Sequence, residues 1–346
     1  MKAVKVIASI LLASCMVSGA FASGKKDEKK EVKFGVLSYL NISETEYGKT
    51  KVAGAEIMDI LSKENYVKRE EKSFAVDKSA HPVTVYYDSL DALVMALTSG
   101  EIYSIGSLPQ TTARYLSAQN PSIAPAFEFD WKKARTDGGF ALTALNLLGD
   151  GFSFMMREDQ SALRDDFNKV IAEMEKDGSL DALVFEYVLK TDNLKPIELE
   201  QKPGRATITV AVTGSLPPFD YVAADGTFAG FNTAFLAEVG KRLDRNIKLV
   251  QVSSVGRATA LASGTVDAVF WTRSTFDPSF AKMSDEDFLA YAQQKGALTA
   301  ERERAALRNY LLLLPPKKHH SMDMPSGTIV TNPYFKDIPV AVYLKK

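Results

Sequence analysis

Two ten-residue segments repeat one pattern, and this repeat constrains the fold more than any other feature of the chain. ALTSGEIYSI (96–105) and ALASGTVDAV (260–269) align without a gap. In each, a small apolar stretch typical of a helix end runs into Ser-Gly, a common helix stop, and then into residues that favour a strand. A strand signal and a helix signal precede each segment in the same order. The chain is therefore expected to contain two α/β units of one design.

Strand and helix signals alternate in both units. In the first unit we expect strands at 32–40 and 83–87. Helices are expected at 53–65 and at 88–100, with Asp88 as the N-cap and Gly100 as the stop of the second helix. In the second unit, strands at 207–212, 247–252 and 265–271 alternate with helical patterns. This alternation favours parallel βαβ units.

The segment from 151 to 190 carries the clearest helical pattern. Apolar residues recur at helical spacing up to Asp177-Gly178, which breaks the helix, and Ser179 is expected to cap a second one. The following stretch, 194–205, contains Pro196 and Pro203-Gly204 and is predicted to be a linker. The expected organisation is a first unit at 32–193, the linker at 194–205 and a second unit at 206–346.

Length, composition and charge are those of a folded protein without a nucleic-acid partner. The chain has 346 residues, of which 46% are hydrophobic, and its formal net charge is −1. This is enough apolar material for a sizeable core. The charge balance gives no sign of nucleic-acid binding or of a polybasic membrane patch.

The N-terminal residues resemble an export signal. Lys2 and Lys5 precede an apolar stretch at 6–17, and Ala20-Phe21-Ala22 supplies a small-x-small cleavage pattern. Residues 1–22 are therefore expected to be a signal peptide, with a mature chain that starts at Ser23 and acts outside the cytoplasm, in the periplasm or at the cell surface. The apolar stretch is too short to span a bilayer well.

Cys15 leaves an alternative open. It is the single cysteine, and Leu12-Ala13-Ser14-Cys15 resembles a bacterial lipoprotein box, in which Cys15 would carry a lipid anchor. In both readings a disulfide cannot form within the mature chain.

The second unit resembles a known family of binding proteins. Strand, Pro-Pro-Phe, Asp-Gly, Gly-Phe and an amphipathic helix follow one another in ITVAVTGSLPPFDYVAADGTFAGFNTAFLAEVGKRL (208–243), and ALASGTVDAVF and TNPYFKDIPVAVYLKK come later. This order is similar to the bacterial extracellular solute-binding proteins, family 3, which serve amino-acid ABC importers and have the periplasmic binding protein type 2 fold. The segment 151–188 resembles the helix pair that closes such proteins.

The resemblance implies an α/β fold of two periplasmic-binding-protein-like lobes with an interlobe cleft. It implies a small, amino-acid-like ligand and an ABC transporter permease as partners, with no enzymatic activity, cofactor or metal. The membrane would be reached only through the possible lipid anchor. The chain departs from the family order of lobe 1, lobe 2 and a return to lobe 1, and an insertion lies at about 277–325. Two separate, incomplete domains are therefore an alternative to one shared cleft.

A first group of candidate ligand contacts lies near the end of the second repeated segment. Ligands of open parallel sheets bind beyond the carboxyl ends of the strands. Trp271, Thr272 and Arg273 are expected to follow directly after a strand there. An indole offers a flat apolar face, and a guanidinium can hold a carboxylate through two parallel hydrogen bonds. The alternative is a core tryptophan beside a solvated arginine.

Further candidates follow from the other strand ends. The resemblance implies that aromatic residues such as Phe219 and Tyr221 pack on the ligand, although Phe219 could equally belong to the core. Asn232 opens a helix and either caps it or faces the cleft. Tyr39 occupies in the first unit the place that Phe219 has in the second.

The family holds its ligand's carboxylate with an arginine in a Thr-x-x-Arg helix start. The second unit has FDPS (276–279) there instead, whereas the first has Thr111-Thr112-Ala113-Arg114. Thr111 and Arg114 are therefore candidates, because an arginine in the first turn of a helix adds its charge to free backbone N–H groups. An ordinary surface arginine is the alternative for Arg114.

Two other functions were weighed. One is a sensor or scaffold with the same fold and degraded or signalling-coupled ligand binding, which the missing Thr-x-x-Arg of the second unit favours. The other is an enzyme of the cyclohexadienyl dehydratase kind, with Asp220 or Asp267 as acid or base. Asp267 is expected instead to bond a neighbouring backbone group. Common hydrolase and P-loop motifs are absent from the sequence.

Overall fold

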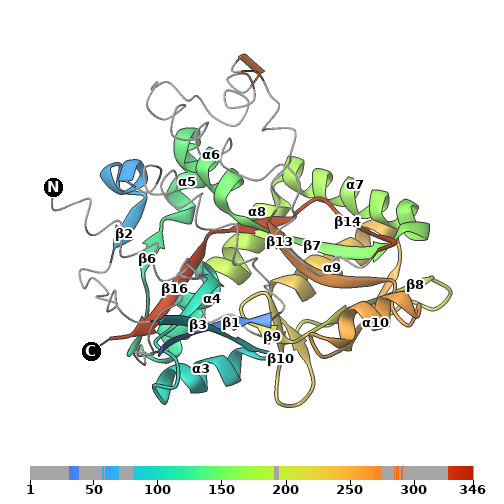
Figure 1. Ribbon diagram of the computed structural model, residues 1–346. Coiled ribbons are helices and arrows are strands. Elements are labelled where there is room, and N and C mark those ends of the chain that lie inside the picture. Colours follow the sequence, from blue (N-terminus) through green and yellow to red (C-terminus); the bar gives the residue numbers. More distant parts are fainter. Residues whose placement is uncertain are drawn as a thin grey trace.

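The computed structural model describes residues 31–38, 57, 59–69, 81–190, 195–274, 284, 286–287, 290 and 326–345. The strands, in chain order, are β1 (Glu31–Leu37), β2 (Val67–Arg69), β3 (His81–Tyr87), β4 (Ser104–Pro109), β5 (Ile123–Pro125), β6 (Phe127–Phe129), β7 (Asp150–Arg157), β8 (Thr207–Val212), β9 (Ser215–Leu216), β10 (Asp220–Val222), β11 (Phe228–Ala229), β12 (Asn246–Gln251), β13 (Ala268–Ser274), β14 (Thr328–Val330), β15 (Phe335–Asp337) and β16 (Pro339–Leu344). The helices are α3 (Leu90–Thr98), α4 (Gln110–Gln119), α5 (Trp131–Asp137), α6 (Gly139–Leu148), the 3-10 turn η2 (Glu158–Gln160), α7 (Ser161–Asp177), α8 (Ser179–Leu183), the π-helix η3 (Val184–Leu189), α9 (Phe231–Leu243) and α10 (Gly256–Ala262) (Figure 1).

The first large sheet has five strands in the order β3-β1-β4-β16-β5. β1 pairs in parallel with β3 and β4, and β16 runs antiparallel between β4 and β5. Helix α3 packs against β1, β3, β4 and β16, and α4 packs against β4, β5 and β16. We call this sheet with its helices the first lobe.

The second large sheet has the order β12-β8-β13-β7-β14, with β15 also paired to β7. β8 pairs in parallel with β12 and β13, and β7 runs antiparallel to β13, β14 and β15. Helices α7, α9 and α10 pack on this sheet, and α8 and η3 pack against α9. We call this group the second lobe.

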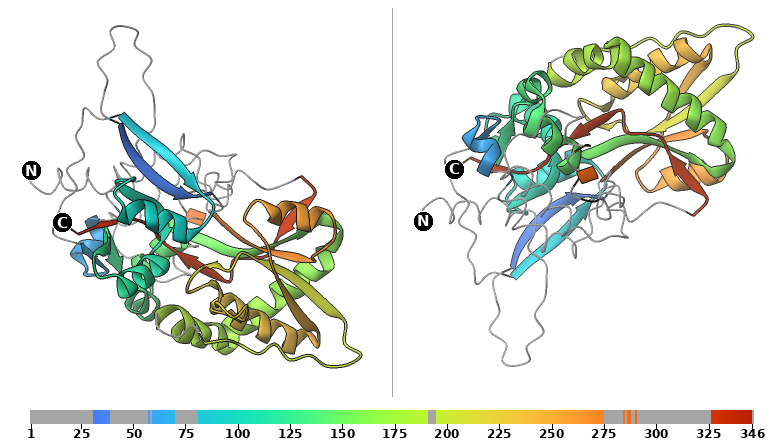
Figure 2. Two further views of the ribbon diagram at one scale, coloured as in Figure 1. Left: turned by 90° about the horizontal axis from the view of Figure 1, so that it is seen from below. Right: turned by 90° about the horizontal axis from the view of Figure 1, so that it is seen from above.

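The two sheets share one design. In each, three parallel strands from one continuous stretch of chain lie beside an antiparallel strand that comes from a distant stretch: β16 in the first lobe and β7 in the second. The chain therefore crosses between the sheets twice, before β7 and between β15 and β16. Figure 2 shows the two lobes side by side, with the red strand β16 among the cyan and teal elements of the first lobe.

The expected α/β fold of two lobes is confirmed. The division at 194–205 that the sequence suggests remains a prediction about chain units. The sheets divide the chain elsewhere, since β7 precedes that linker but belongs to the second sheet, and β16 follows it but belongs to the first.

The repeated segments end their helices in the same way. Gly100 and Gly264 both have positive φ, at 76° and 70°, a conformation that glycine adopts without steric cost. The N–H of each glycine is donated three residues back, to the Leu97 and Leu261 carbonyls, over 3.1 Å in both cases. The internal repeat expected from the sequence is therefore confirmed in backbone geometry.

Four local expectations were wrong. The stretch expected to be helical from 151 onward begins with strand β7, and its helix α7 starts only at Ser161. Helix α3 begins at Leu90 with Ser89 as N-cap, whose Oγ accepts from the Ala92 N–H at 3.2 Å, so Asp88 is not the cap. Ser179 is the first residue of α8, and Gly178 is its N-cap. β13 does not end before Thr272 but runs on to Ser274.

One cluster of buried apolar side chains spans both lobes. It includes Leu93 and Leu97 of α3 as well as Phe235 of α9. Stacked rings link its parts, for example Phe154 with Tyr334 at 5.2 Å between centroids. Among the described residues, none of the helices combines the length and the apolar character needed to cross a membrane.

Candidate functional site

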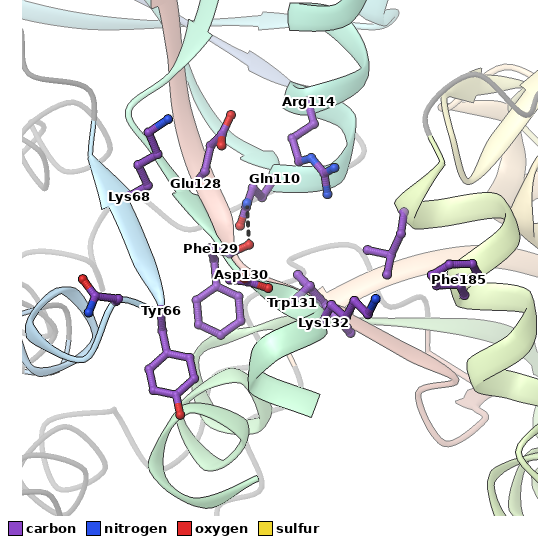
Figure 3. Close-up of a pocket in the computed structure, with 12 residues that line it drawn as sticks. Tyr66, Lys68, Gln110, Arg114, Glu128, Phe129, Asp130, Trp131, Lys132 and Phe185 are labelled. Atoms are coloured by element: carbon purple, nitrogen blue, oxygen red, sulfur yellow. Dashed lines mark hydrogen bonds between the residues drawn. The ribbon is translucent and has the colours of Figure 1, made fainter. Parts of the chain in front are cut away.

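A hollow of about 410 Å³ lies between elements of both lobes. Figure 3 shows Gln110 and Arg114 of α4, Glu128 and Phe129 of β6 and Trp131 and Lys132 of α5 around it, with Phe185 of η3 on the opposite side. Its lining residues are Asn65, Tyr66, Lys68, Gln110, Arg114, Glu128, Phe129, Asp130, Trp131, Lys132, Phe185 and Leu189. Its size falls within the usual range of small-ligand sites, about 300–1,000 Å³.

Helix α4 directs two polar side chains toward the hollow. Gln110 and Arg114 are four residues apart and therefore lie on one face of the helix. Gln110 is 1% exposed; its Nε2 donates to the Phe129 carbonyl at 3.1 Å, and its Oε1 has no hydrogen-bond partner among the described residues. Since the Phe129 carbonyl can only accept, this contact fixes the orientation of the amide.

Arg114 gives the hollow a cation that no group in the described part of the chain neutralises. Within the described ranges its side chain makes no hydrogen bond and no ion pair. Of the two acids nearby, Asp130 uses Oδ1 to accept from the Lys133 N–H at 2.8 Å and so caps α5. The guanidinium is therefore available to an anionic group of a solute.

Aromatic rings supply the apolar walls. Trp131 and Phe129 are buried, and Phe185 is 46% exposed. The Lys132 Nζ lies 5.7 Å from the centre of the Phe185 ring, so a cation of the first lobe faces a ring of the second. The hollow thus combines flat apolar surface with polar groups, as small-ligand sites do.

Thr111 does not line the hollow. It is 1% exposed, and both its backbone N–H (2.9 Å) and its hydroxyl (2.5 Å) donate to Oδ2 of Asp337. The other oxygen, Oδ1, accepts from Trp131 Nε1 at 3.3 Å. Burial raises the pKa of Asp337 to about 6, although these hydrogen bonds work in the opposite direction.

Phe219 lies in the core in this structure. Its side chain is 0% exposed, and its ring stacks on that of Phe152 with 4.3 Å between the centroids. Asn232 does not cap α9, because the N-cap is Gly230. Instead the Asn232 Oδ1 accepts from the Tyr334 hydroxyl at 2.5 Å, while Nδ2 has no partner in the ranges that the structure describes.

Tyr221 lies where the lobes approach each other. It belongs to β10 and is half-buried. Burial raises the pKa of Tyr115 on α4, and Tyr221 adds to this shift through its charge. Tyr115 follows Arg114 directly on α4, and Tyr221 belongs to the small sheet β11-β10-β9.

Trp271, Thr272 and Arg273 do not follow their strand, as expected, but form part of it. They pair with Ser153, Phe152 and Gly151 of β7. Their side chains lie outside the described part of the structure, as does the whole of Tyr39.

The two carboxylates considered for catalysis hold backbone groups. Asp220 Oδ2 accepts from the N–H (2.7 Å) and the hydroxyl (2.8 Å) of Thr213. Asp267 Oδ2 accepts from the Thr209 N–H at 2.8 Å, which confirms the role expected for it.

Arg114 is the one lining residue of the hollow that was predicted from the sequence. Gln110, Trp131 and Phe185, and Asp337 beside them, are among the residues of this region that were not. Gln110 could have been found, because it stands four residues before Arg114 on the same predicted helix. Asp337 is separated from Thr111 by 226 positions and gives no local signal.

The family model of bacterial extracellular solute-binding proteins, family 3, matches residues 208–277. The resemblance predicted from the sequence is therefore confirmed for this part of the chain. A search of curated proteins found no match.

Solved structures of binding proteins are similar to the chain at low identity. The ligand-binding component of an ABC-type import system from Staphylococcus aureus, with zinc bound, has 12% identity and a TM-score of 0.31 over 91% of this chain and 66% of that one. The PBP AgaA from A. tumefacien, in complex with agropinic acid, has 11% identity and a TM-score of 0.35 over 77% of this chain and 55% of that one. A ligand-binding core from Nostoc punctiforme, in complex with (L)-glutamate, has 9% identity and a TM-score of 0.31 over 91% and 85%.

The chain thus spans less than two thirds of the length of the first two of these proteins. TM-scores this low do not define a shared arrangement of the whole chain. The assignment of the fold rests on the strand order of the two sheets and on the family match.

Proposed function

We propose that this protein is the extracytoplasmic solute-binding component of an ABC-type importer, and that it captures a small polar solute, amino-acid-like, between its lobes. The observation that carries the proposal is Arg114, an arginine without a protein partner in the described ranges, at an interlobe hollow of about 410 Å³. The family match at 208–277 supports the same class of function.

The hollow suits a solute with a carboxylate and a hydrogen-bond donor. A carboxylate would bind the Arg114 guanidinium through charge-assisted hydrogen bonds. The Oε1 of Gln110, one helical turn away, has no hydrogen-bond partner within the described ranges. Because this atom is buried, an ammonium or amide N–H of the solute would reach it only after a shift of the side chain. The rings of Trp131 and Phe185 offer apolar contact to the rest of the solute.

Trp271 and Arg273 remain proposed contacts from β13. Closure of the lobes around the solute would remove water from the Arg273 guanidinium. Breaking such a buried pair costs roughly 2–5 kcal/mol, so Arg273→Ala should weaken binding at least about thirtyfold. Normal binding by Arg273→Ala would leave Arg114 as the arginine of the site.

A ligand screen followed by matched arginine variants tests the proposal. A solute at 100 times its dissociation constant stabilises the folded protein by about 2.7 kcal/mol, which thermal-shift screening of amino acids, oligopeptides and organic acids detects. Arg114→Ala should weaken binding of the identified solute at least about thirtyfold, and Arg114→Lys less, because lysine keeps the charge without the planar fork.

Arg164→Ala is the control. Arg164 lies on α7, where its Nε pairs with Asp165 at 2.6 Å, and it should not affect binding. Equal affinity of Arg114→Ala and Arg164→Ala would contradict the assignment of the solute to this hollow.

Export and lipidation are part of the proposal, although residues 1–30 lie outside the described structure. Cleavage after Ala22 gives a mature chain that begins at Ser23. Mass spectrometry of the exported protein distinguishes this from an acylated Cys15, and an uncleaved N-terminus would contradict both.

A sensor or scaffold is the second candidate, and Phe219 favours it. The aromatic that the family resemblance places against the ligand is 0% exposed here. A protein that binds no transported solute but changes a signalling partner's activity would support this candidate. Uptake that depends on the chain would support the importer.

A further inference from the structure

Asp337 stands at one of the two places where the chain passes between the lobes. It is the last residue of β15, which pairs with β7 in the second sheet, and β16 of the first sheet starts two residues later. Its side chain is 1% exposed. A buried carboxylate persists where hydrogen bonds satisfy it, so its partners show what it holds.

The N-cap residue of helix α4 does not satisfy the first N–H groups of the helix. This residue is Pro109, whose side chain provides no hydrogen bond. The first N–H groups of a helix have no partner within the helix, and a side-chain acceptor normally satisfies them. Here Asp337 does so, because its Oδ2 accepts from both the N–H and the hydroxyl of Thr111.

The same carboxylate holds a second wall of the hollow. Its Oδ1 accepts from Trp131 Nε1 at 3.3 Å. The Trp131 ring also stacks on Phe335 of β15, with centroids 4.6 Å apart and planes 5° apart. Asp337 of the crossing strand thus bonds both the Trp131 ring and α4, the helix that carries Gln110 and Arg114. Figure 3 shows Trp131, Gln110 and Arg114 around the hollow.

We propose that Asp337 is a positioning residue for the solute site: it caps α4 from the crossing strand, fixes Trp131, and thereby ties the geometry of the hollow to the segment that joins the lobes. The effect of Asp337 on solute binding rests on the function proposed above, in which the hollow is the solute site. The capping of α4 and the positioning of Trp131 do not depend on a ligand. A change in the direction of β15 and β16 would shift Arg114 and Trp131 together.

Asp337→Asn is the decisive variant. An amide keeps one oxygen and replaces the other with a donor. Since Oδ1 and Oδ2 each accept two hydrogen bonds, the amide nitrogen must face a pair of donors on one side. Either the cap of α4 or the contact with Trp131 is lost.

Hydrogen exchange of the unliganded protein measures this loss directly. Loss of hydrogen bonds to a charged group should accelerate exchange at 110–114, or at 129–133 around Trp131, by about tenfold or more. Asp267→Asn is the matched control, since Asp267 also accepts from a backbone N–H and a side-chain amide but lies in the second lobe. It should leave exchange of both segments unchanged.

Binding is measured by calorimetry with each of the twenty standard amino acids as probe. An amino acid that binds the wild type should bind Asp337→Asn about tenfold more weakly, and should bind Asp267→Asn as it binds the wild type. Unchanged exchange of both segments in Asp337→Asn would overturn the proposal, and so would accelerated exchange without any loss of affinity.

Two further outcomes are distinguishable. If none of the amino acids binds the wild type, the amino-acid-like ligand of the proposed function fails, while hydrogen exchange still decides the role of Asp337. If Asp337→Asn does not fold, Thr111→Val takes its place, because it removes only the hydroxyl donor. Thr111→Val should then accelerate exchange at 110–114, whereas Thr111→Ser should exchange as slowly as the wild type. Equal exchange rates in the two variants would overturn the proposal.

Discussion

Phe219→Ala separates a core role from a ligand contact, because the two roles predict opposite results. In this structure Phe219 is 0% exposed, and its ring lies 4.3 Å from that of Phe152 and 5.2 Å from that of Phe335, centre to centre. The truncation should therefore reduce the free energy of unfolding. It should not remove a contact with the ligand.

The expected magnitude follows from the burial. Phe→Ala in a core costs about 3–5 kcal/mol, since the transfer of the ring and the cavity left behind both contribute. We expect the upper half of that range, because stacked pairs add about 0.5–1.5 kcal/mol each. At about 2–4 °C per kcal/mol for a cooperative unit of this size, Tm should fall by roughly 8–20 °C.

Thermal unfolding, monitored by circular dichroism, measures the change in Tm, with Phe185→Ala as control. Phe185 is 46% exposed, so its truncation should cost about 1 kcal/mol or less. If Phe219→Ala keeps the wild-type Tm and abolishes solute binding, Phe219 is a ligand contact and the core assignment is refuted.

Further predictions concern the helix stops, pH and the linker. Gly100→Ala and Gly264→Ala should each lower the unfolding free energy by about 1 kcal/mol in urea titrations, because both positions have positive φ although a methyl group would have space at Gly100; unchanged midpoints would contradict this. Hydrogen bonds from Ser179 lower the pKa of Asp177 to about 2. The stabilising contribution of Asp177 should therefore be complete above about pH 4 and lost as pH falls towards 2. NMR titration of the carboxyl group checks this, and an ordinary pKa would refute it. Limited proteolysis should cut first at 194–205 or at 277–325, whereas early cuts inside 96–105 or 260–269 would contradict the two-unit interpretation.

The local and repetitive parts of the fold could be predicted from the sequence. The Ser-Gly stops, the alternation of strands and helices and the break at Gly178 depend on residues close together in the chain. Arg114 was placed near the start of a helix for the same reason, since a helix start depends on neighbouring residues; α4 begins at Gln110, four residues earlier. The two-lobe architecture then followed from the repeat.

The rest depends on long-range pairing, which leaves no local signal. β13 continues to Ser274 because β7, from more than a hundred residues earlier, pairs with its whole length. Thr111 appeared to be a ligand contact until Asp337, 226 positions away, proved to accept both of its hydrogen bonds. Phe219 could not be assigned from sequence, because a ligand platform and a core contact use the same side chain.

The position of β16 has a consequence for the order in which the molecule assembles. β16 lies between β4 and β5, so every other strand of the first sheet is made long before the strand that joins them. Until residues 339–344 arrive, β4 presents an open edge with unpaired N–H and C=O groups, the kind of edge through which chains associate wrongly. The first sheet therefore cannot be completed until β16 has been synthesised. Its protection from aggregation depends on a strand that follows the whole second sheet in the chain.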